Sequence, residues 1–375
     1  MEWLKIKGYY HFSSQVSNDW RRQKLLIQHV QNKNYIAKYA FFPLLHTNIK
    51  ERRYKKHPSK LNKKGKAIRV HSYYDEDKKK FVKTTKIRPL HYANHKDAVI
   101  YSYYAFILNK YYENYLKTFP QLNASITAYR KIPVLNSTLA DEKIKNKGSL
   151  HFAAEVFKEI KERAKYKDKV AVIALDIKSF FSSLDHVYLK KLWEYILGVP
   201  NLPSDHFNVF KSVTNFSFVY KNDLRKFKTR KGRKANFNEK KIAEIRNKKG
   251  INAFFKNPKD FREAIKNKEI FVYKNNFKNK KGEMIGIPQG LPISAVLANL
   301  YLLEFDKVIV NELVKKHNCF YRRYSDDIIL IGEEMDLNKI EDFVIKEMKK
   351  VKVEISKEKT EKFIFKKANG RLTSF

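Results

Sequence analysis

Apolar residues recur with helical spacing in several segments of the chain. In residues 97–116 they cover much of the helical circumference, which predicts a helix that is buried on most sides. In residues 152–165 they recur at Phe152, Val156 and Ile160, which predicts a helix with one apolar face. Further helices are predicted at residues 186–197, 294–315 and 337–350.

Short apolar runs predict strands between these helices. The unbroken run VAVIAL at residues 170–175 is typical of a buried strand. Residues 319–324 and 328–331 are strand-like runs joined by Ser325-Asp326-Asp327, and residues 351–355 alternate like an edge strand. The order strand, helix, long insert, helix, hairpin, helix and strand predicts an α+β fold, in which an antiparallel sheet carries helices on one face.

The charge balance indicates a polyanionic partner. The chain has 375 residues, enough for two or three subdomains, and its 79 Lys and Arg against 39 acidic residues give a formal net charge of +40. Hydrophobic residues make up 43% of the chain, so it can still bury cores. Nucleic acid is the partner that such an excess fits. Composition leaves a ribosome-associated or membrane-surface protein open as the alternative.

Other features exclude several classes of protein. Cys319 is the single cysteine, which excludes an internal disulfide and a cysteine-based zinc site. No apolar run approaches the length that spans a bilayer, and the first residues lack the apolar stretch of a secretion signal. We therefore expect a cytoplasmic protein without a membrane partner.

Two segments concentrate the basic residues. Residues 50–69 hold ten Lys or Arg and one acid, and with Pro58 and Gly65 they are predicted to form a loop or flexible finger. Residues 221–280 hold 21 Lys or Arg and six acids, which predicts an inserted, partly helical segment that follows a phosphate backbone. Its aromatic residues would stack on unpaired bases or form a small local core. Its candidate nucleic-acid-binding residues are Lys228, Arg230, Lys231, Arg233 and Lys234.

Three carboxylates follow predicted strands. Asp176 ends the VAVIAL run, and Asp326-Asp327 lies in the tight hairpin between the two later strands. Each of them alone is better explained as a helix cap or a turn residue. Adjacent like charges repel, however, and a bound cation would relieve that repulsion. If the strands lie side by side, the three carboxylates would hold two metal ions roughly 3.5–4 Å apart, the geometry of polymerases and nucleases.

An ordered series of short motifs resembles the reverse transcriptases. The matching segments are residues 87–90 (IRPL) and 128–130 (AYR) for the fingers, 176–181 (DIKSFF) with 184–186 (LDH) for the first catalytic block, 287–294 (IPQGLPIS) for the second, 323–327 (RYSDD) for the third, and Lys359-Thr360 for the fourth. Ser325 stands where Ala or Met is commoner in this family. The matches run in the family's order and cover most of residues 86–360.

The resemblance implies a set of catalytic residues. Asp176 and Asp326 would be the main metal ligands, Asp327 would support them, and the backbone carbonyl of Ile177 would also face metal. The expected cofactor is a pair of Mg²⁺ ions, with Mn²⁺ as a substitute. Lys359 would act as a general acid that protonates the leaving pyrophosphate.

The resemblance also implies a nucleotide site. Phe181 would be a steric gate that disfavours a 2′-hydroxyl, although core packing also explains a Phe at this position. Gln289 and Gly290 would lie near the incoming nucleotide and the template base, in a segment that also reads as a turn before a helix. The triphosphate would be held by Lys86, Arg88 and Arg130, for which a solvated basic face is the alternative.

These implications describe an RNA-directed DNA polymerase with the right-hand architecture of fingers, palm and thumb. Within the family the chain resembles bacterial enzymes of the retron, group II intron and abortive-infection types, most of all those of antiphage defence. The expected partners are an RNA template, which would be a dedicated non-coding RNA, the DNA product and dNTPs. The alternatives are template-independent or protein-primed synthesis at the same site, and a catalytically idle RNA-binding protein.

The motifs divide the chain into expected regions. They are a basic N-terminal extension of the fingers (1–85), fingers (86–168), the first palm block (169–200), the basic insert (201–281), the remaining palm (282–360) and the start of a primer grip and thumb (361–375). Only fifteen residues follow Thr360, so we expect a short or missing thumb. A partner protein or a second copy of the chain would then complete it.

Overall fold

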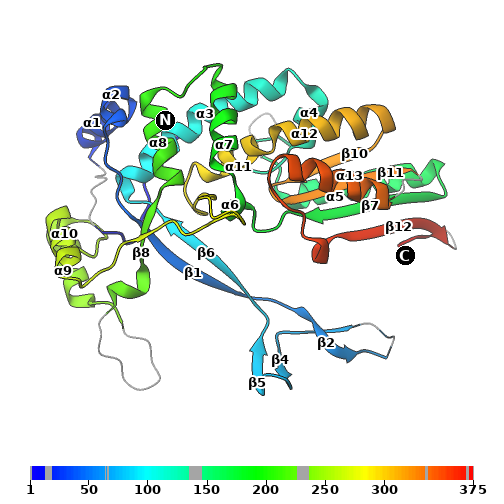
Figure 1. Ribbon diagram of the computed structural model, residues 1–375, viewed down its shortest axis with the longest axis horizontal. Coiled ribbons are helices and arrows are strands. Elements are labelled where there is room, and N and C mark those ends of the chain that lie inside the picture. The colour runs from blue at the N-terminus through cyan, green and yellow to red at the C-terminus, as the bar shows by residue number, and fades with distance from the viewer. Residues whose placement is uncertain are drawn as a thin grey trace, which may run out of the picture.

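A five-stranded antiparallel sheet forms the centre of the molecule, with strand order β10-β11-β7-β12-β13 (Figure 1). The structure is a computed structural model that describes residues 2–12, 19–63, 65, 67–134, 146–225, 236–333, 337–368 and 371–374. The strands are β7 (Lys169–Asp176), β10 (Phe320–Tyr324), β11 (Asp327–Glu333), β12 (Glu361–Ala368) and β13 (Arg371–Ser374). The predicted strands at 170–175, 319–324 and 328–331 are thus confirmed within one or two residues.

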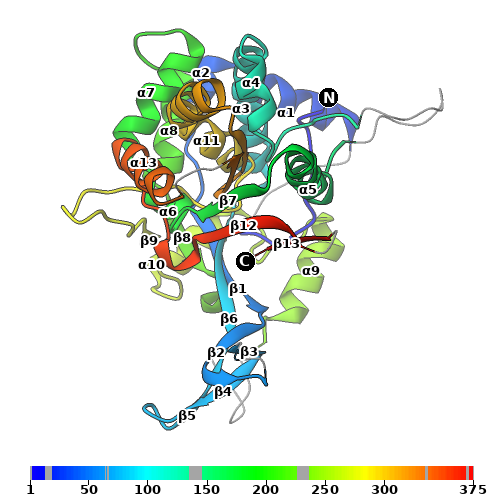
Figure 2. The ribbon, with the colours of Figure 1, turned by 90° about the vertical axis from the view of Figure 1, so that its right-hand side faces the viewer.

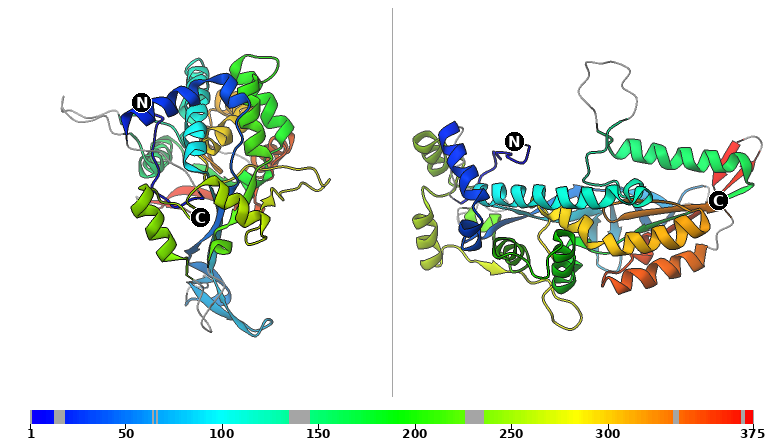
Figure 3. Two further views of the ribbon diagram at one scale, coloured as in Figure 1. Left: turned by 90° about the vertical axis from the view of Figure 1, so that its left-hand side faces the viewer. Right: turned by 90° about the horizontal axis from the view of Figure 1, so that it is seen from above.

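Helices cover both faces of this sheet, which corrects the prediction of helices on one face. Because successive side chains of β7 point to opposite faces, Ile173 and Leu175 enter the main core. Val170 and Val172 pack instead against Ile160 of α5 (Ser149–Tyr166). Figures 2 and 3 show α5 and α13 (Leu337–Lys350) on opposite sides of the sheet.

The main core lies on the side of α13 and is built mostly by helices that the apolar pattern predicted. The helices at 97–116, 186–197 and 337–350 are confirmed as α3 (His95–Lys117), α7 (His186–Leu197) and α13. The helix predicted at 294–315 is interrupted at Leu302, whose ψ of 6° separates α11 (Ser294–Tyr301) from α12 (Leu303–Ile309). A π-helical segment, η2 (Val310–Lys315), follows α12.

The edge strand predicted at residues 351–355 is not formed. Lys352 has φ of 59°, which turns the chain directly after α13, and only Ile355 makes an isolated bridge, to Ile177. Val351, Val353 and Ile355 are buried, so their alternation reflects core contacts of a loop. The place beside β7 is taken by β12, which comes later in the chain.

A second sheet, with strand order β6-β1-β8-β9, is built from the expected fingers region and the basic insert, and we refer to it and its hairpins as the fingers (Figure 1). Its long hairpin pairs β1 (Leu44–Arg52) with β6 (Thr85–Tyr92). At the far end of this hairpin the chain forms two smaller hairpins, so the loop predicted at residues 50–69 is largely strand. The other strands of the fingers are β2 (Lys55–Leu61), β3 (Ala67–Val70), β4 (Ser72–Asp75), β5 (Lys80–Lys83), β8 (Ser217–Tyr220) and β9 (Tyr273–Lys274).

The basic insert is partly helical, as predicted, and has a core of its own. Phe254, Phe255 and Phe261 pack with Phe12 and Val219, so these aromatics belong to a local core and are not free to stack on bases. The five basic residues proposed for nucleic-acid binding, Lys228 to Lys234, lie outside the described residues. Its helices are η1 (Lys221–Leu224), α9 (Glu239–Lys249) and α10 (Pro258–Lys266).

The remaining helices are α1 (Trp20–Gln31), α2 (Lys33–Ala37), α4 (Pro120–Ser125), α6 (Phe180–Ser183), α8 (Ser204–Thr214) and η3 (Lys357–Lys359). Across the described part of the chain, no helix has the length and apolar character needed to cross a membrane.

Candidate active site

The strand register brings the three predicted carboxylates to one end of the central sheet. Asp176, the last residue of β7, pairs directly with Asp327, the first residue of β11. Asp326 lies in the turn between β10 and β11, and its carbonyl accepts a hydrogen bond of 3.0 Å from the Ile177 amide. Ser325, the first residue of this turn, has φ of 61°. The two segments are 150 residues apart in sequence, and adjacent strands explain why they meet here.

The carboxylates are close enough to affect one another. Burial raises the pKa of Asp327, and the charges of Asp326 and Asp176 raise it further. The Lys359 ammonium lies 2.5 Å from Oδ1 of Asp176 and partly offsets this negative charge. Among the described residues, no group of three or more His, Cys, Asp or Glu side chains is arranged to hold a metal ion. The donor atoms are nonetheless carboxylate oxygens, which suit a hard cation such as Mg²⁺.

A pocket of about 330 Å³ opens beside the hairpin and gathers candidates from three parts of the chain. Lys86 and Arg88 come from β6 of the fingers, and Phe181 comes from α6, directly after the Asp176 strand. The pocket is completed on the palm side by Ile177, Gln289, Asp326 and Lys359. Its lining therefore combines basic groups, the Asp326 carboxylate and aromatic rings.

Two of the three proposed triphosphate contacts lie in this pocket, and the third does not. Lys86 is exposed, and Arg88 is half-buried with its Nε 2.6 Å from Glu51 Oε1. The guanidinium of Arg130 is buried and points away from the pocket, where it donates to the carboxylate of Glu113 and to the carbonyl of Ile126. Arg130 thus holds the fingers block to α3, and the structure does not bring it to the phosphate position.

The pocket also contains residues that the motif analysis did not single out. They include His91, Tyr129, Ser179 and Phe277. The hydroxyls of Tyr129 and Ser325 lie 3.1 Å apart, which links the fingers block to the Asp326 turn. The AYR match marked this segment, but only the fold shows that Tyr129 is the member that reaches the site.

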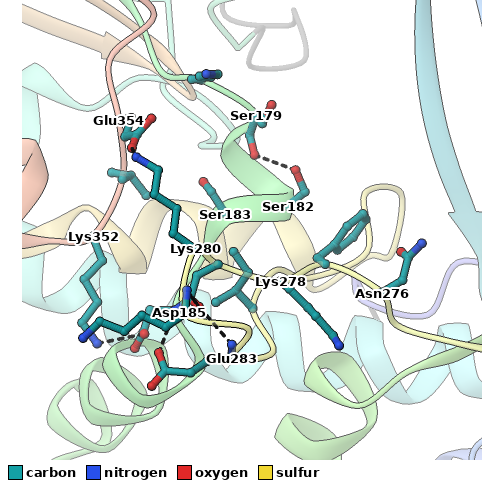
Figure 4. A pocket seen from close by; sticks show the side chains of 16 residues that line it. Ser179, Ser182, Ser183, Asp185, Asn276, Lys278, Lys280, Glu283, Lys352 and Glu354 are labelled. Atoms are coloured by element: carbon teal, nitrogen blue, oxygen red, sulfur yellow. Dashed lines mark hydrogen bonds and ion pairs between the residues drawn. The ribbon is translucent and has the colours of Figure 1, made fainter.

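A larger cavity of about 720 Å³ adjoins the pocket and shares Ser179, Ser182 and Phe277 with it (Figure 4). Lysines line much of this cavity, but two of them are paired: Lys352 with Asp185 at 2.8 Å, and Lys280 with Glu354 at 3.3 Å. Lysines thus line the cavity next to the pocket, as Lys86 and Arg88 line the pocket itself.

Gly290 fixes the distance between the second catalytic block and the fingers. Its φ is +115°, and a Cβ atom at this position would lie 2.8 Å from the carbonyl oxygen of His91 in β6. The His91 amide in turn donates to the Gln289 carbonyl at 2.9 Å. The pocket wall therefore depends on close backbone contact, which explains why a glycine is needed here.

We expect Gly290→Ala to push β6 away from Gln289 and to lower the rate of nucleotide incorporation by about tenfold or more, because small displacements of positioning groups are costly. Gly282→Ala is the matched control. Gly282 also has positive φ (+81°), but no atom lies within 4 Å of the position that a Cβ would take there. Steady-state incorporation kinetics should show a large loss only for Gly290→Ala, and equal losses would mean that backbone strain alone is responsible.

A comparison with known protein families finds a match in part of the chain. A sequence model of the family described as "Reverse transcriptase (RNA-dependent DNA polymerase)" matches residues 236–371. The matched segment contains Asp326, Asp327 and Lys359 but begins after Asp176. No curated protein matches the chain.

Solved telomerase structures are similar to the chain at low sequence identity. Apo telomerase from Candida tropicalis, truncated from its C-terminal domain, is 12% identical with a TM-score of 0.44, over 76% of this chain and 48% of that one. Candida albicans telomerase in complex with a TWJ fragment of telomeric RNA is 12% identical with a TM-score of 0.36, over 68% and 33%. The chain thus spans less than half the length of these structures. Residues 236–371 carry the sequence pattern of a reverse transcriptase domain, to which the fold adds Asp176.

Proposed function

We propose that this chain is an RNA-directed DNA polymerase. The observation that supports it best is the pairing of Asp176 with Asp327 beside Asp326, which lines the pocket that also contains Lys86, Phe181 and Gln289. Phosphoryl transfer needs charge neutralisation and positioning more than covalent chemistry, and this arrangement provides groups for both. The match of residues 236–371 to the reverse transcriptase family supports the same reaction.

In this proposal the carboxylates of Asp176, Asp326 and Asp327 hold two Mg²⁺ ions, for which Mn²⁺ would substitute. The bound ions supply an activated 3′-hydroxyl and stabilise the charge that develops on the transferred phosphate. Lys86 and Arg88 hold the triphosphate from the fingers side. Lys359 leaves Asp176 and protonates the departing pyrophosphate.

Phe181 is proposed to select deoxynucleotides by filling the space that a 2′-hydroxyl would need. Its ring lines the pocket, and its carbonyl accepts a 2.7 Å hydrogen bond from the Ile287 amide, which fixes its backbone beside the second catalytic block. Phe180 is buried in the main core and also lines the pocket, and the partly buried Phe181 packs against the same core, so core packing accounts for part of the burial of both rings.

We expect Phe181→Val to raise kcat/KM for ribonucleotides by about tenfold to a hundredfold relative to deoxynucleotides. This is the range of discrimination that a change in the size of one pocket side chain usually produces. Phe277→Val is the matched control, because Phe277 also lines the pocket but comes from the loop before the second block. Paired measurements with dATP and ATP check the ratio. An unchanged ratio for Phe181→Val would remove this residue from sugar selection.

The activity is tested with purified protein, Mg²⁺ and labelled dNTPs or NTPs, on a primed RNA template and on the nucleic acid that copurifies. Incorporation of dNTPs that is lost after RNase treatment supports RNA-directed DNA synthesis. Incorporation that survives RNase supports template-independent or protein-primed synthesis, and no incorporation supports an idle RNA-binding protein. Sequencing the copurified RNA tests the proposed dedicated non-coding RNA, and with it the role in bacterial antiphage defence.

A further inference from the structure

The far end of the fingers hairpin is a separate, strongly basic unit. Residues 50–83 hold fourteen Lys or Arg and four acids, and they form the β2-β3 and β4-β5 hairpins. Figures 1 and 3 show these hairpins projecting away from the body of the molecule. In the described chain, none of these residues belongs to a hydrophobic core cluster. We call this unit the fingertip.

The fingertip is held in place by a buried junction at Thr84. The Thr84 hydroxyl lies within hydrogen-bond distance of the carbonyls of Arg53, Val70 and His71, and it can donate to one of them at a time. The Thr84 amide donates to the His71 carbonyl at 2.9 Å, and the Arg53 amide donates to the Thr84 carbonyl at 3.1 Å. These bonds join both hairpins to the end of the β1-β6 hairpin, so the unit has a defined position.

The β4-β5 hairpin has one face turned inward and one face turned outward. Tyr73 lies opposite Val82, and the Tyr73 ring contacts His57 of the neighbouring hairpin at a centroid distance of 5.3 Å. On the other face Tyr74 lies opposite Phe81, with ring centroids 5.3 Å apart and no core behind them. The side chains of Tyr74 and Phe81 are 43% and 74% exposed. Lys83, two residues from Phe81, shares this outer face and is also exposed.

We propose that Tyr74 and Phe81 form a stacking platform for unpaired bases of the template strand, with the exposed lysines of the β4-β5 hairpin on its phosphates. Exposed aromatic rings within a basic surface are the combination that binds single strands, because every base offers a ring face. A duplex would fit only the lysines, since its base faces are already stacked. This inference rests on the proposed function, in which the chain copies a single-stranded RNA template.

The distance to the nucleotide pocket fixes a length requirement. Phe81 is seven residues from Arg88 along strands β5 and β6. At a rise of about 3.3 Å per residue, the platform is at most about 23 Å from the pocket. A stacked strand advances about 3.4 Å per nucleotide, so an overhang of about seven unpaired nucleotides is long enough to reach it.

The test measures binding of primed RNA templates by fluorescence anisotropy, in the absence of divalent ions so that no turnover occurs. The templates carry a 5′ overhang of three or twelve nucleotides, and a third template has its twelve-nucleotide overhang covered by a complementary strand. The variant is Tyr74→Ala/Phe81→Ala. Its matched control is Phe106→Ala/Tyr111→Ala, which removes one exposed Phe and one exposed Tyr, 41% and 46% exposed, from α3.

We expect the platform variant to weaken binding of the twelve-nucleotide overhang by at least about fivefold, and to leave the short and covered overhangs unchanged. Phe81→Trp should retain full binding, and the α3 control should have no effect. Equal weakening on all three templates, or none on the long overhang, would overturn the proposal. Primer extension on the three-nucleotide overhang tests the polymerase separately, so a chain that binds as expected but does not extend would refute only the proposed function.

Discussion

Asp326→Asn is expected to reduce nucleotide incorporation by about a thousandfold or more while leaving the protein folded. The neutral amide weakens the proposed ligand set, and metal ions in such sites supply several kcal/mol of transition-state stabilisation. A loss of about 4 kcal/mol corresponds to a thousandfold in rate. Single-turnover incorporation of dNTPs on a primed RNA template, at saturating Mg²⁺, is the measurement.

Asp342→Asn is the matched control for this substitution. Asp342 is an exposed residue of α13, so the same change of charge there should leave the rate unaltered. Incorporation by Asp326→Asn within tenfold of the wild-type rate would remove Asp326 from the catalytic site. It would also remove the main support for the proposed function, because the pairing of strands would then have no chemical consequence.

Thermal stability provides an independent check on the same variant. Burial and the neighbouring charges of Asp326 and Asp176 raise the pKa of Asp327 in the folded protein. Ionised Asp327 therefore lowers the free energy of unfolding at any pH above the ordinary carboxyl pKa. Asp326→Asn removes one of these charges. We therefore expect its Tm at neutral pH to equal or exceed that of the wild type, and the difference to shrink as the pH falls and the carboxyls become protonated.

Three of the five strands of the central sheet, β7, β10 and β11, could be predicted from the sequence because they have strand-like runs with clear ends, whereas β12 and β13 were not predicted. The run at residues 170–175 ends at Asp176, and the two later runs flank Asp326, so local pattern placed each carboxylate at a strand end. The fold adds that β7 and β11 are neighbours in a register that pairs Asp176 with Asp327. Local periodicity contains no information about which strands pair.

The errors have the same origin. Residues 351–355 alternate as a strand does, but β12 pairs with β7 in their place, a competition that only tertiary structure decides. Residues 50–69 contain Pro58 and Gly65 and many charges, which indicate a loop, yet pairing between β2 and β3 outweighs that local preference. Arg130 matched a motif, but its side chain bonds to Glu113 of α3 and Asn123 of α4. These contacts depend on the packing of the helices, which a motif match does not contain.

The burial of Arg323 could not be predicted from the sequence either, because a charged residue in a strand is usually expected to face solvent. Its side chain is fully buried, as is its partner Asp306 of α12, which lies 2.6 Å away. Its remaining N–H groups donate to Asn299 Oδ1 and to the carbonyl of Ser325, in the turn that carries Asp326. Asn299 donates in turn to the Ala128 carbonyl of the fingers block. Arg323 therefore holds the backbone of the turn that carries Asp326.

Arg323→Met is expected to lower the free energy of unfolding by about 3–5 kcal/mol, because it leaves Asp306 buried without a compensating charge. Urea denaturation followed by circular dichroism measures this loss. The triple variant Arg323→Met/Asp306→Leu/Tyr321→Phe removes the buried carboxylate and the Tyr321 hydroxyl that donates to it, so it should regain most of the stability.

Stability and activity should then separate in the triple variant. It lacks the hydrogen bond to the Ser325 carbonyl, so the turn loses its support, and we expect incorporation to remain about tenfold or more below wild type although the protein is folded. Full activity in a stable triple variant would show that Arg323 only satisfies a buried charge. A persistent defect would show that the buried pair is retained because it holds Asp326 in its position at the pocket.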